Sequence, residues 1–360
     1  MIKIKEKKIK FKRGSIKTPF FMPDATRGFV KFLDNNEVLE TGINAMVVNT
    51  FHLYLNPGLK IIKKAGGIHN FMNWKNHLLS DSGGFQVFSL IHNNSKMGKI
   101  SDEGVIFKSP LDGSVHELTP EKSIQIQFDL GTDMMVCFDD CAPYAFSEKE
   151  MEDSVLRTVA WAKRCKKEYD KQIKKRKISK EERPLLFSVI QGGKSFELRK
   201  KCFEELVKED FDGYGFGGRP VDENGKFLKD ILKFTADLIP DDKLKFALGV
   251  GMPKDIKKCV KMGWNMFDCV IPTREGRHGR LFYFKNKKDL GKEEFYKTIN
   301  INNSKFSNDF SFINEESKIK ELKLYSKAYL HHLFKLKDPL GSRLASLNNL
   351  EFYVEIMKLM

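Results

Sequence analysis

The sequence predicts a (β/α)8 barrel, because eight short β-rich runs recur along the chain with helical stretches between them. The runs are apolar, and each ends in a polar residue or a glycine. Stretches with helical spacing separate several of them, such as Phe196 to Glu209, Phe227 to Leu238 and Pro253 to Met262, and this alternation implies a parallel sheet. Eight such units favour a closed barrel over an open sheet. The runs are Phe20 to Asp24, Met46 to Asn49, Leu78 to Asp81, Met134 to Asp139, Leu186 to Gln191, Tyr214 to Gly218, Phe246 to Gly249 and Met266 to Asp268.

The composition is that of a soluble globular protein. Of 360 residues, 41% are hydrophobic and 31% are charged, which is enough for a core that needs neither a disulfide nor a metal. No apolar run approaches the roughly 18–20 residues that cross a bilayer, and the N-terminus is charged where a signal peptide would be apolar. Six cysteines are scattered singly, which favours reduced thiols. We therefore expect a cytoplasmic protein.

The net charge points to a polyanionic partner. The formal charge is +15, and lysine and arginine side chains gain affinity for nucleic acid by releasing counterions from its phosphates. A lysine-rich genome would produce part of the same excess. The charge alone names no substrate.

Two parts of the chain fall outside a plain (β/α)8 repeat. The gap from about 93 to 119 contains VIFKSPLDGSVHEL, two alternating runs around a Leu-Asp-Gly-Ser turn, which predicts an inserted β-hairpin. After Phe284 the pattern predicts further helices, notably Lys318 to Phe334 and Arg343 to Met360. We expect a catalytic barrel over residues 1–284, including the hairpin, and a helical appendage over residues 285–360 that is integrated with the barrel.

Three carboxylates lie at or near the ends of predicted strands. Asp81, Asp139 and Asp268 follow short apolar runs, where an ionised aspartate is costly unless it is paired or used. Each one alone could be a helix N-cap. In a (β/α)8 barrel, however, the carboxyl ends of the strands share one face, so these side chains and Gln191 should meet there. Two carboxylates on one cavity suit glycosyl chemistry, in which one attacks the anomeric carbon and the other moves the proton.

Glycine pairs follow three of the same strands. They are Gly83-Gly84, Gly192-Gly193 and Gly217-Gly218. Glycine at these junctions lets the backbone approach a flat ligand such as a nucleobase, although each pair could simply permit a tight turn. The run Gly213-x-Gly215-x-Gly217-Gly218 is no dinucleotide fingerprint, because its glycines lie within or at the end of a strand.

Several longer blocks resemble the signatures of tRNA-guanine transglycosylases. The resemblance runs in consistent order from about Thr18 to Tyr283 and resumes at YSKAYLHHLF and GSRLASLNNLEFY, so it covers nearly the whole chain. The blocks are MVVNTFHLYLNPG (Met46 to Gly58), LLSDSGGFQVFSL (Leu78 to Leu90), VIQGG (Val189 to Gly193), FALGVGMP (Phe246 to Pro253) and MFDCVIPTREGRHG (Met266 to Gly279).

The resemblance implies a ping-pong mechanism on RNA. Asp268 would attack C1′ of the target ribose and expel guanine, leaving a covalent RNA–enzyme intermediate. Asp81 would be the general acid and base. Arg274 and Arg277 would hold the RNA backbone. The residues implied to bind the base are Ser82, Phe85, Asp139, Gln191, Gly217, Gly218 and Leu248, and Cys141 would line the pocket.

The chain departs from this family's pattern at two places. The family usually has a structural zinc held by three cysteines and a histidine, but Ser317, Ile319, Leu322 and Asn348 stand at those positions, so we expect no metal and no cofactor. Apolar packing by Ile319 and Leu322 would replace the ion. The second departure is Arg219-Pro220 after the glycine pair, which leaves the choice of incoming base open between preQ1, queuine and a related 7-deazaguanine.

The leading interpretation is an enzyme that exchanges guanine at position 34 of tRNAs with a G-U-N anticodon for a 7-deazaguanine. Three alternatives remain. One is a paralogue that modifies DNA or another RNA, another is a non-catalytic tRNA-binding subunit, and the last is a metal-dependent hydrolase, which only His52 and the aspartates favour. The resemblance also implies a homodimer, and no feature predicts a membrane partner.

Overall fold

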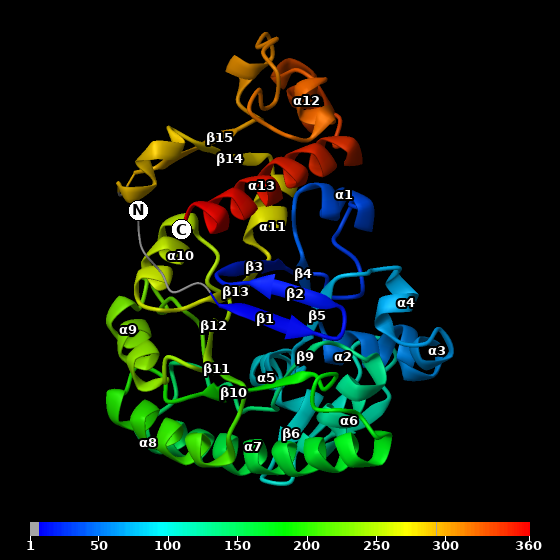
Figure 1. Ribbon diagram of the computed structural model, residues 1–360, viewed down its shortest axis with the longest axis vertical. Helices are drawn as coiled ribbons and strands as arrows, with labels where there is room; N and C mark the ends of the chain where they lie inside the picture. Colours follow the sequence, from blue (N-terminus) through cyan, green and yellow to red (C-terminus); the bar gives the residue numbers. More distant parts are fainter. Residues whose placement is uncertain (1–6, 293) are drawn as a thin grey trace.

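Eight parallel strands form a sheet that curls nearly into a closed barrel (Figure 1), which confirms the predicted fold class. The computed structural model describes residues 7–292 and 294–360. A parallel bridge between Asp24 and Val47 joins the first and last strands of the sheet. In order around the sheet the strands are β3 (Phe20–Pro23), β13 (Met266–Cys269), β12 (Leu244–Ala247), β11 (Gly213–Phe216), β10 (Leu185–Ile190), β9 (Met134–Val136), β5 (His77–Ser80) and β4 (Ala45–Val48).

The strands begin within two residues of the predicted runs, and all but β13 end earlier. The reason is that the polar residue closing each run, such as Asp81 after β5 or Gln191 after β10, lies in the loop beyond the strand. These side chains are therefore at the carboxyl-terminal mouth of the barrel, where the loops can turn them toward a ligand.

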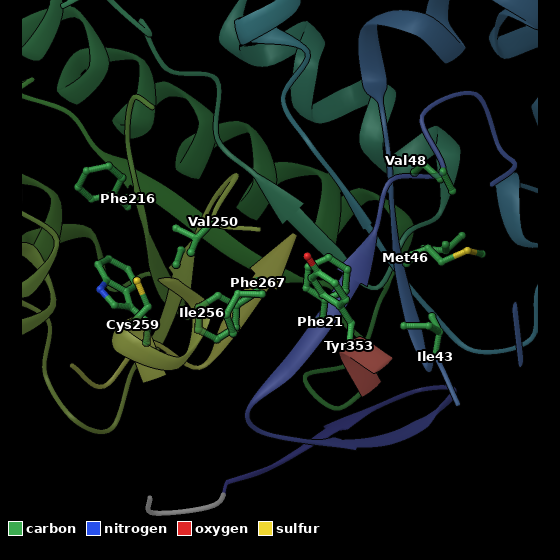
Figure 2. Close-up of a cluster of buried hydrophobic side chains, with 14 of the residues drawn as sticks. Phe21, Ile43, Met46, Val48, Phe216, Val250, Ile256, Cys259, Phe267 and Tyr353 are labelled. Atoms are coloured by element: carbon green, nitrogen blue, oxygen red, sulfur yellow. The ribbon is translucent and has the colours of Figure 1, made fainter. Parts of the chain in front are cut away.

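Alternate residues of each strand pack into two separate apolar layers. Phe20, Met22 and Val47 belong to the layer inside the barrel, whereas Phe21 and Met46 face the surrounding helices. Figure 2 shows part of the outer layer, in which the ring of Tyr353 from the last helix lies 4.8 Å from that of Phe21. Because both faces of the sheet are buried, the strands are mostly apolar, as expected of a parallel barrel.

Helices cover the outside of the barrel. The long helix α7 begins with a capping box between Ser147 and Glu150 and ends at Lys177, which has a left-handed conformation. Helices α7, α8 and α9 lie along the side away from the C-terminal helices α12 (Lys327–Lys335) and α13 (Pro339–Leu359) (Figure 1). No helix of the described chain is long and apolar enough to span a bilayer. The α-helices that precede Arg280 are α1 (Asn35–Glu40), α2 (Thr50–Leu53), α3 (Leu59–Lys64), α4 (Ile68–Met72), α5 (Gly84–Asn93), α6 (Pro120–Leu130), α7 (Glu148–Arg176), α8 (Phe196–Leu206), α9 (Lys229–Leu238), α10 (Pro253–Lys261) and α11 (Ile271–Arg277).

In the described part of the chain, three small antiparallel sheets accompany the barrel, and one of them belongs to the C-terminal part. The hairpin of β1 (Lys8–Phe11) and β2 (Gly14–Lys17) places Ile16 against the inner layer at the amino-terminal end of the strands, so the site lies at the other end. Strands β7 (Val105–Lys108) and β8 (Val115–Leu118) pair on either side of the Leu-Asp-Gly-Ser turn. A third strand, β6 (Gly98–Ile100), pairs with β7, so this sheet has three strands and not the two of a simple hairpin.

The C-terminal part packs tightly on the barrel. It contains the hairpin of β14 (Arg280–Phe284) and β15 (Tyr296–Asn300) and the helices α12 (Lys327–Lys335) and α13 (Pro339–Leu359). The predicted helix from Lys318 to Phe334 is wrong in its first half. Residues 318–326 contain only a short 3-10 turn, and Ser326 caps the helix that comes after it. The Tyr353 hydroxyl on α13 donates a hydrogen bond to the Gly251 carbonyl beyond β12, at 2.5 Å.

Candidate active site

A cavity of about 480 Å³ opens at the carboxyl-terminal mouth of the barrel. Most of the predicted site residues line it, namely Asp81, Ser82, Phe85, Asp139, Gly217, Gly218, Leu248, Asp268 and Arg274. Gln191 lies directly behind the cavity wall and contacts Asp139. Arg277 lies one turn beyond Arg274 on α11. The barrel thus brings together side chains that are up to about 190 residues apart in the sequence, because all of them follow parallel strands.

Asp139 and Gln191 form a buried polar pair on one wall. Gln191 Nε2 donates to Asp139 Oδ2 at 2.7 Å, and the Ser82 hydroxyl donates to Oδ1 at 3.5 Å. Burial raises the pKa of Asp139 to about 6, and the hydrogen bond from Gln191 opposes part of this rise. A carboxylate beside a carboxamide offers acceptors and donors side by side, which is the pattern that the edge of a guanine-like base requires.

Three hydrogen bonds hold the Asp81 carboxylate just before the start of α5. Asn49 Nδ2 donates to Oδ2 at 2.6 Å, and the Thr50 and Gly83 amides donate to Oδ1 at 3.0 and 3.1 Å. Burial nevertheless raises the pKa of Asp81 to about 7. A carboxyl group with a pKa near neutrality can both give and take a proton at physiological pH. Asn49 was not among the predicted site residues, although it closes the predicted run Met46 to Asn49.

Asp268 lies at the end of β13, with Oδ1 accepting a hydrogen bond from the Gly249 amide at 3.1 Å. Burial, with the neighbouring negative charges of Asp24 and Asp81, raises its pKa to about 8. Asp24 lines the same cavity and was missed by the sequence analysis. The available signal was its position at the end of the first predicted run. Asp24, Asp81 and Asp268 therefore share the mouth of the barrel with Asp139.

The glycine pair after β11 adds no side chains to one wall of the cavity. A Cβ atom on Gly217 would come within 2.5 Å of the Gln191 side chain. Gly218 has φ +89°, a conformation that favours glycine, and lies beside the ring of Tyr144. Cys141 also lines the cavity, and burial raises the pKa of its thiol to about 12. Because a thiol with so high a pKa stays protonated at neutral pH, Cys141 is unsuited to act as a nucleophile.

Comparison with known proteins agrees with this geometry. The family model described as "Queuine tRNA-ribosyltransferase" matches residues 5–360. Proteins of that name from Caldanaerobacter subterraneus subsp. tengcongensis and Francisella tularensis subsp. novicida are each 43% identical to the chain. The two alignments cover 96% and 99% of this chain and 86% and 90% of the relatives. The chain belongs to this family.

The positions that correspond to the family's zinc ligands hold a different kind of cluster. The Ser317 hydroxyl donates to Glu351 Oε2 at 2.6 Å, and the Asn348 amide donates to the Phe282 carbonyl at 3.0 Å. Ile319 and Leu322 are buried in the apolar core. These side chains offer no thiolate or imidazole, so they do not fit a zinc ion. Among the described residues, no group of three or more His, Cys, Asp or Glu side chains is placed to hold a metal.

We predict that Glu351 stabilises this part of the molecule. It is 7% exposed and also accepts a hydrogen bond from the Lys318 amide at 2.7 Å, so Glu351→Ala would leave buried donors unpaired. We expect a loss of about 1–3 kcal/mol in the free energy of unfolding, measured by urea titration. Glu316→Ala, an exposed neighbour, is the control and should change it little. If EDTA lowered the stability of the wild type, a bound metal would be shown instead.

We also predict that the buried Asp268 carboxyl group destabilises the fold as the pH rises. The folded protein holds the Asp268 proton up to about pH 8, whereas an unfolded aspartate loses it near pH 4. Stability from this group is therefore complete below about pH 4 and is lost as the pH rises toward 8. Asp268→Asn, which mimics the protonated form, should raise the melting temperature by about 3–6 °C at pH 8.5, with a steadily smaller gain toward pH 5. An equal gain at both pH values would contradict the raised pKa.

Proposed function

We propose that this protein exchanges guanine at position 34 of tRNAs with a G-U-N anticodon for a free 7-deazaguanine base. The observation that carries the proposal is that Asp81 and Asp268 face one cavity whose wall presents Asp139, which Gln191 contacts from behind that wall. A flat base fits against that pair, and the two carboxylates supply the acid and the nucleophile that glycosyl transfer needs. Family membership supports the same reaction. The enzyme would act in the cytoplasm.

The proposed first step breaks the bond between the base and the ribose. Asp268 first loses its proton to solvent, which its pKa of about 8 allows in a fraction of the molecules at neutral pH. A carboxylate oxygen of Asp268 then attacks C1′, a C1′–O bond forms, and the C1′–N9 bond breaks with its electron pair passing to guanine. The proton of Asp81 neutralises the departing base. The RNA backbone is not cut, so the sugar remains attached to Asp268 as an ester-like intermediate. No external oxidant, reductant or cofactor is needed for the balance of this step.

The second step reverses the first with a different base. Asp81, now ionised, takes the N9 proton of the incoming 7-deazaguanine, whose nitrogen attacks C1′ and releases the Asp268 carboxylate. Two inversions at C1′ give net retention. A pKa of about 7 for Asp81 suits both roles, because the group is then neither fully protonated nor fully ionised at neutral pH.

The other predicted residues have positioning roles in this proposal. Ser82 and the Gly218 backbone assist Asp139 and Gln191 in binding the base, and Phe85, Gly217 and Leu248 line its slot. Phe85 is 55% exposed at the cavity edge, where its ring can cover the base. Arg274 and Arg277, on the helix after β13, would bind phosphates beside the target nucleotide.

The segment that would meet the 7-substituent is Arg219-Pro220. Both residues line the cavity, and the Tyr144 hydroxyl donates a hydrogen bond to the Arg219 carbonyl. This bond fixes the backbone of the segment against the glycine pair. We infer that the shape of this wall selects between preQ1 and queuine, and that the incoming base is a 7-deazaguanine with a substituent that fits there.

The test is a base-exchange assay with unmodified tRNA of a G-U-N anticodon and labelled guanine. We expect label to enter the tRNA, with preQ1 or queuine competing and thereby identifying the natural base. Incorporation into duplex DNA but not tRNA would identify a DNA-modifying paralogue. Salt-sensitive tRNA binding without any incorporation would identify a non-catalytic subunit. The homodimer implied by the resemblance stays a prediction, to be checked by analytical ultracentrifugation.

A further inference from the structure

Asp24 is a carboxylate at the catalytic centre that has no role in the two steps of the proposed exchange. It directly follows β3, the strand that pairs with β13, in the register that sets Met22 beside Asp268. Its backbone bridges to Val47 of β4, so Asp24 stands at the seam between the strand of the nucleophile and the strands that carry Asn49 and Asp81. Its side chain lines the cavity.

The charged groups around Asp24 come from three elements. Burial raises the pKa of Asp24, and Arg277 and Arg274 of α11 oppose part of that rise, whereas Asp24 itself raises the pKa of Asp268 and Asp81. In residues 7–292 and 294–360, no group donates a hydrogen bond to the Asp24 carboxylate. An acceptor at a cavity edge that has cations nearby but no donor is suited to accept a hydrogen bond from a ligand.

The proposed reaction places the parts of the target nucleotide around this residue. The base lies against Asp139 and Gln191, C1′ must lie within reach of Asp268, and the flanking phosphates must lie toward Arg274 and Arg277. The atoms between C1′ and the phosphates are those of the ribose. Within an RNA chain the 3′ and 5′ oxygens are esterified, so the 2′-hydroxyl, one carbon away from C1′, is the only free hydroxyl of that sugar.

We propose that the Asp24 carboxylate accepts a hydrogen bond from the 2′-hydroxyl of the target nucleotide and thereby makes the enzyme select RNA over DNA. This inference rests on the proposed function. The 2′-hydroxyl is the group by which a protein distinguishes the two nucleic acids at a given site. A bond from it to an ionised carboxylate also holds the ribose with C1′ toward Asp268.

The electrostatics of the site keep the Asp24 carboxyl group ionised, which is the form that accepts a hydrogen bond from a hydroxyl group. Burial raises its pKa to about 6, below the values of about 7 for Asp81 and about 8 for Asp268, because the two arginines oppose the rise. As the pH rises, Asp24 is therefore the first of the three to ionise. At neutral pH it is mostly charged, while Asp81 still retains much of its proton.

The test compares two anticodon stem-loops that differ by one atom. One has guanosine at position 34, and the other has 2′-deoxyguanosine there in an otherwise identical RNA. We expect the wild type to lose about 10-fold or more in kcat/KM on the deoxy substrate, because a hydrogen bond to a charged group is lost. In Asp24→Ala the ratio between the two substrates should fall toward one. Asp24→Asn, a weaker neutral acceptor, should give an intermediate ratio.

The ratio separates this role from the others that Asp24 could have. Any change in the ionisation of Asp268, in the arginines or in folding acts on both substrates and cancels. Asp241→Ala, on an exposed loop before β12 at the opposite end of the barrel, is the control and should keep the wild-type ratio. An unchanged ratio in Asp24→Ala would overturn the inference and leave the exchange activity standing. Absence of exchange by the wild type on the guanosine substrate would instead refute the proposed function itself.

Discussion

Replacing Asp268 with asparagine is expected to reduce guanine exchange by about 10³-fold or more, the scale on which enzymes lose rate with their covalent nucleophile. Asparagine has nearly the same shape, and its oxygen can still accept the hydrogen bond that the Gly249 amide makes to Oδ1. The change therefore removes the attacking charge and little else. Incorporation of labelled guanine into tRNA at position 34 measures the loss.

A denaturing gel gives a second readout of the same variant. The wild type should form a tRNA–protein band that survives denaturation, because the proposed intermediate has a covalent bond between Asp268 and C1′. The variant should form none. Asp230→Asn, on the exposed surface at the start of α9, should retain both the band and the activity. A persistent band in Asp268→Asn would show that another residue is the nucleophile.

The sequence was sufficient to predict the carboxylates that close strands in strongly patterned runs. Asp81, Asp139 and Asp268 each come after apolar residues of a strand, and the carboxyl ends of parallel strands meet at one mouth of the barrel. Asp24 and Asn49 also come directly after strands, yet the sequence analysis assigned them no role. Asn49 reaches Asp81 through the pairing of β4 with β5, and Asp24 reaches Asp268 through the pairing of β3 with β13, the first and last barrel strands in the sequence. The Asp24–Val47 bridge then brings Asp24 next to the strand that precedes Asn49.

In the C-terminal part the sequence analysis predicted too much structure, because local helix propensity suggested a helix that the protein does not form. The residues from Lys318 to Leu324 favour a helix by composition, but Glu351 of α13 holds the Ser317 hydroxyl and the Lys318 amide, and Ile319 and Leu322 are buried. These tertiary contacts outweigh helix propensity, which amounts to less than about 1 kcal/mol per residue. The sequence analysis also began the last helix at Arg343, four residues after its start at Pro339, although Asp338-Pro339 is a cap with proline next to it in the first turn.

Replacing Asp81 with asparagine is expected to reduce exchange by about 10²–10⁴-fold, the range in which general acid–base catalysis contributes to rates. The amide can keep contacts with the Thr50 and Gly83 backbone, but it cannot supply the proton that guanine needs to leave. Unlike the loss at Asp268, this loss depends on the leaving group. A substrate whose leaving group needs no proton should therefore lose little rate in Asp81→Asn.

A tRNA with 7-methylguanosine at position 34 provides that leaving group, because the methylated base already has a positive charge and departs neutral. We expect Asp81→Asn to release 7-methylguanine within about 10-fold of the wild-type rate, and the covalent band to accumulate, since no base then deprotonates the incoming nucleobase. The cavity can take the methyl group if, as proposed, the wall at Arg219-Pro220 accepts 7-substituents. Asp268→Asn should fail on both substrates. If Asp81→Asn were equally impaired on both, Asp81 would be a positioning residue, and the proton would have to come from another group at the mouth of the barrel.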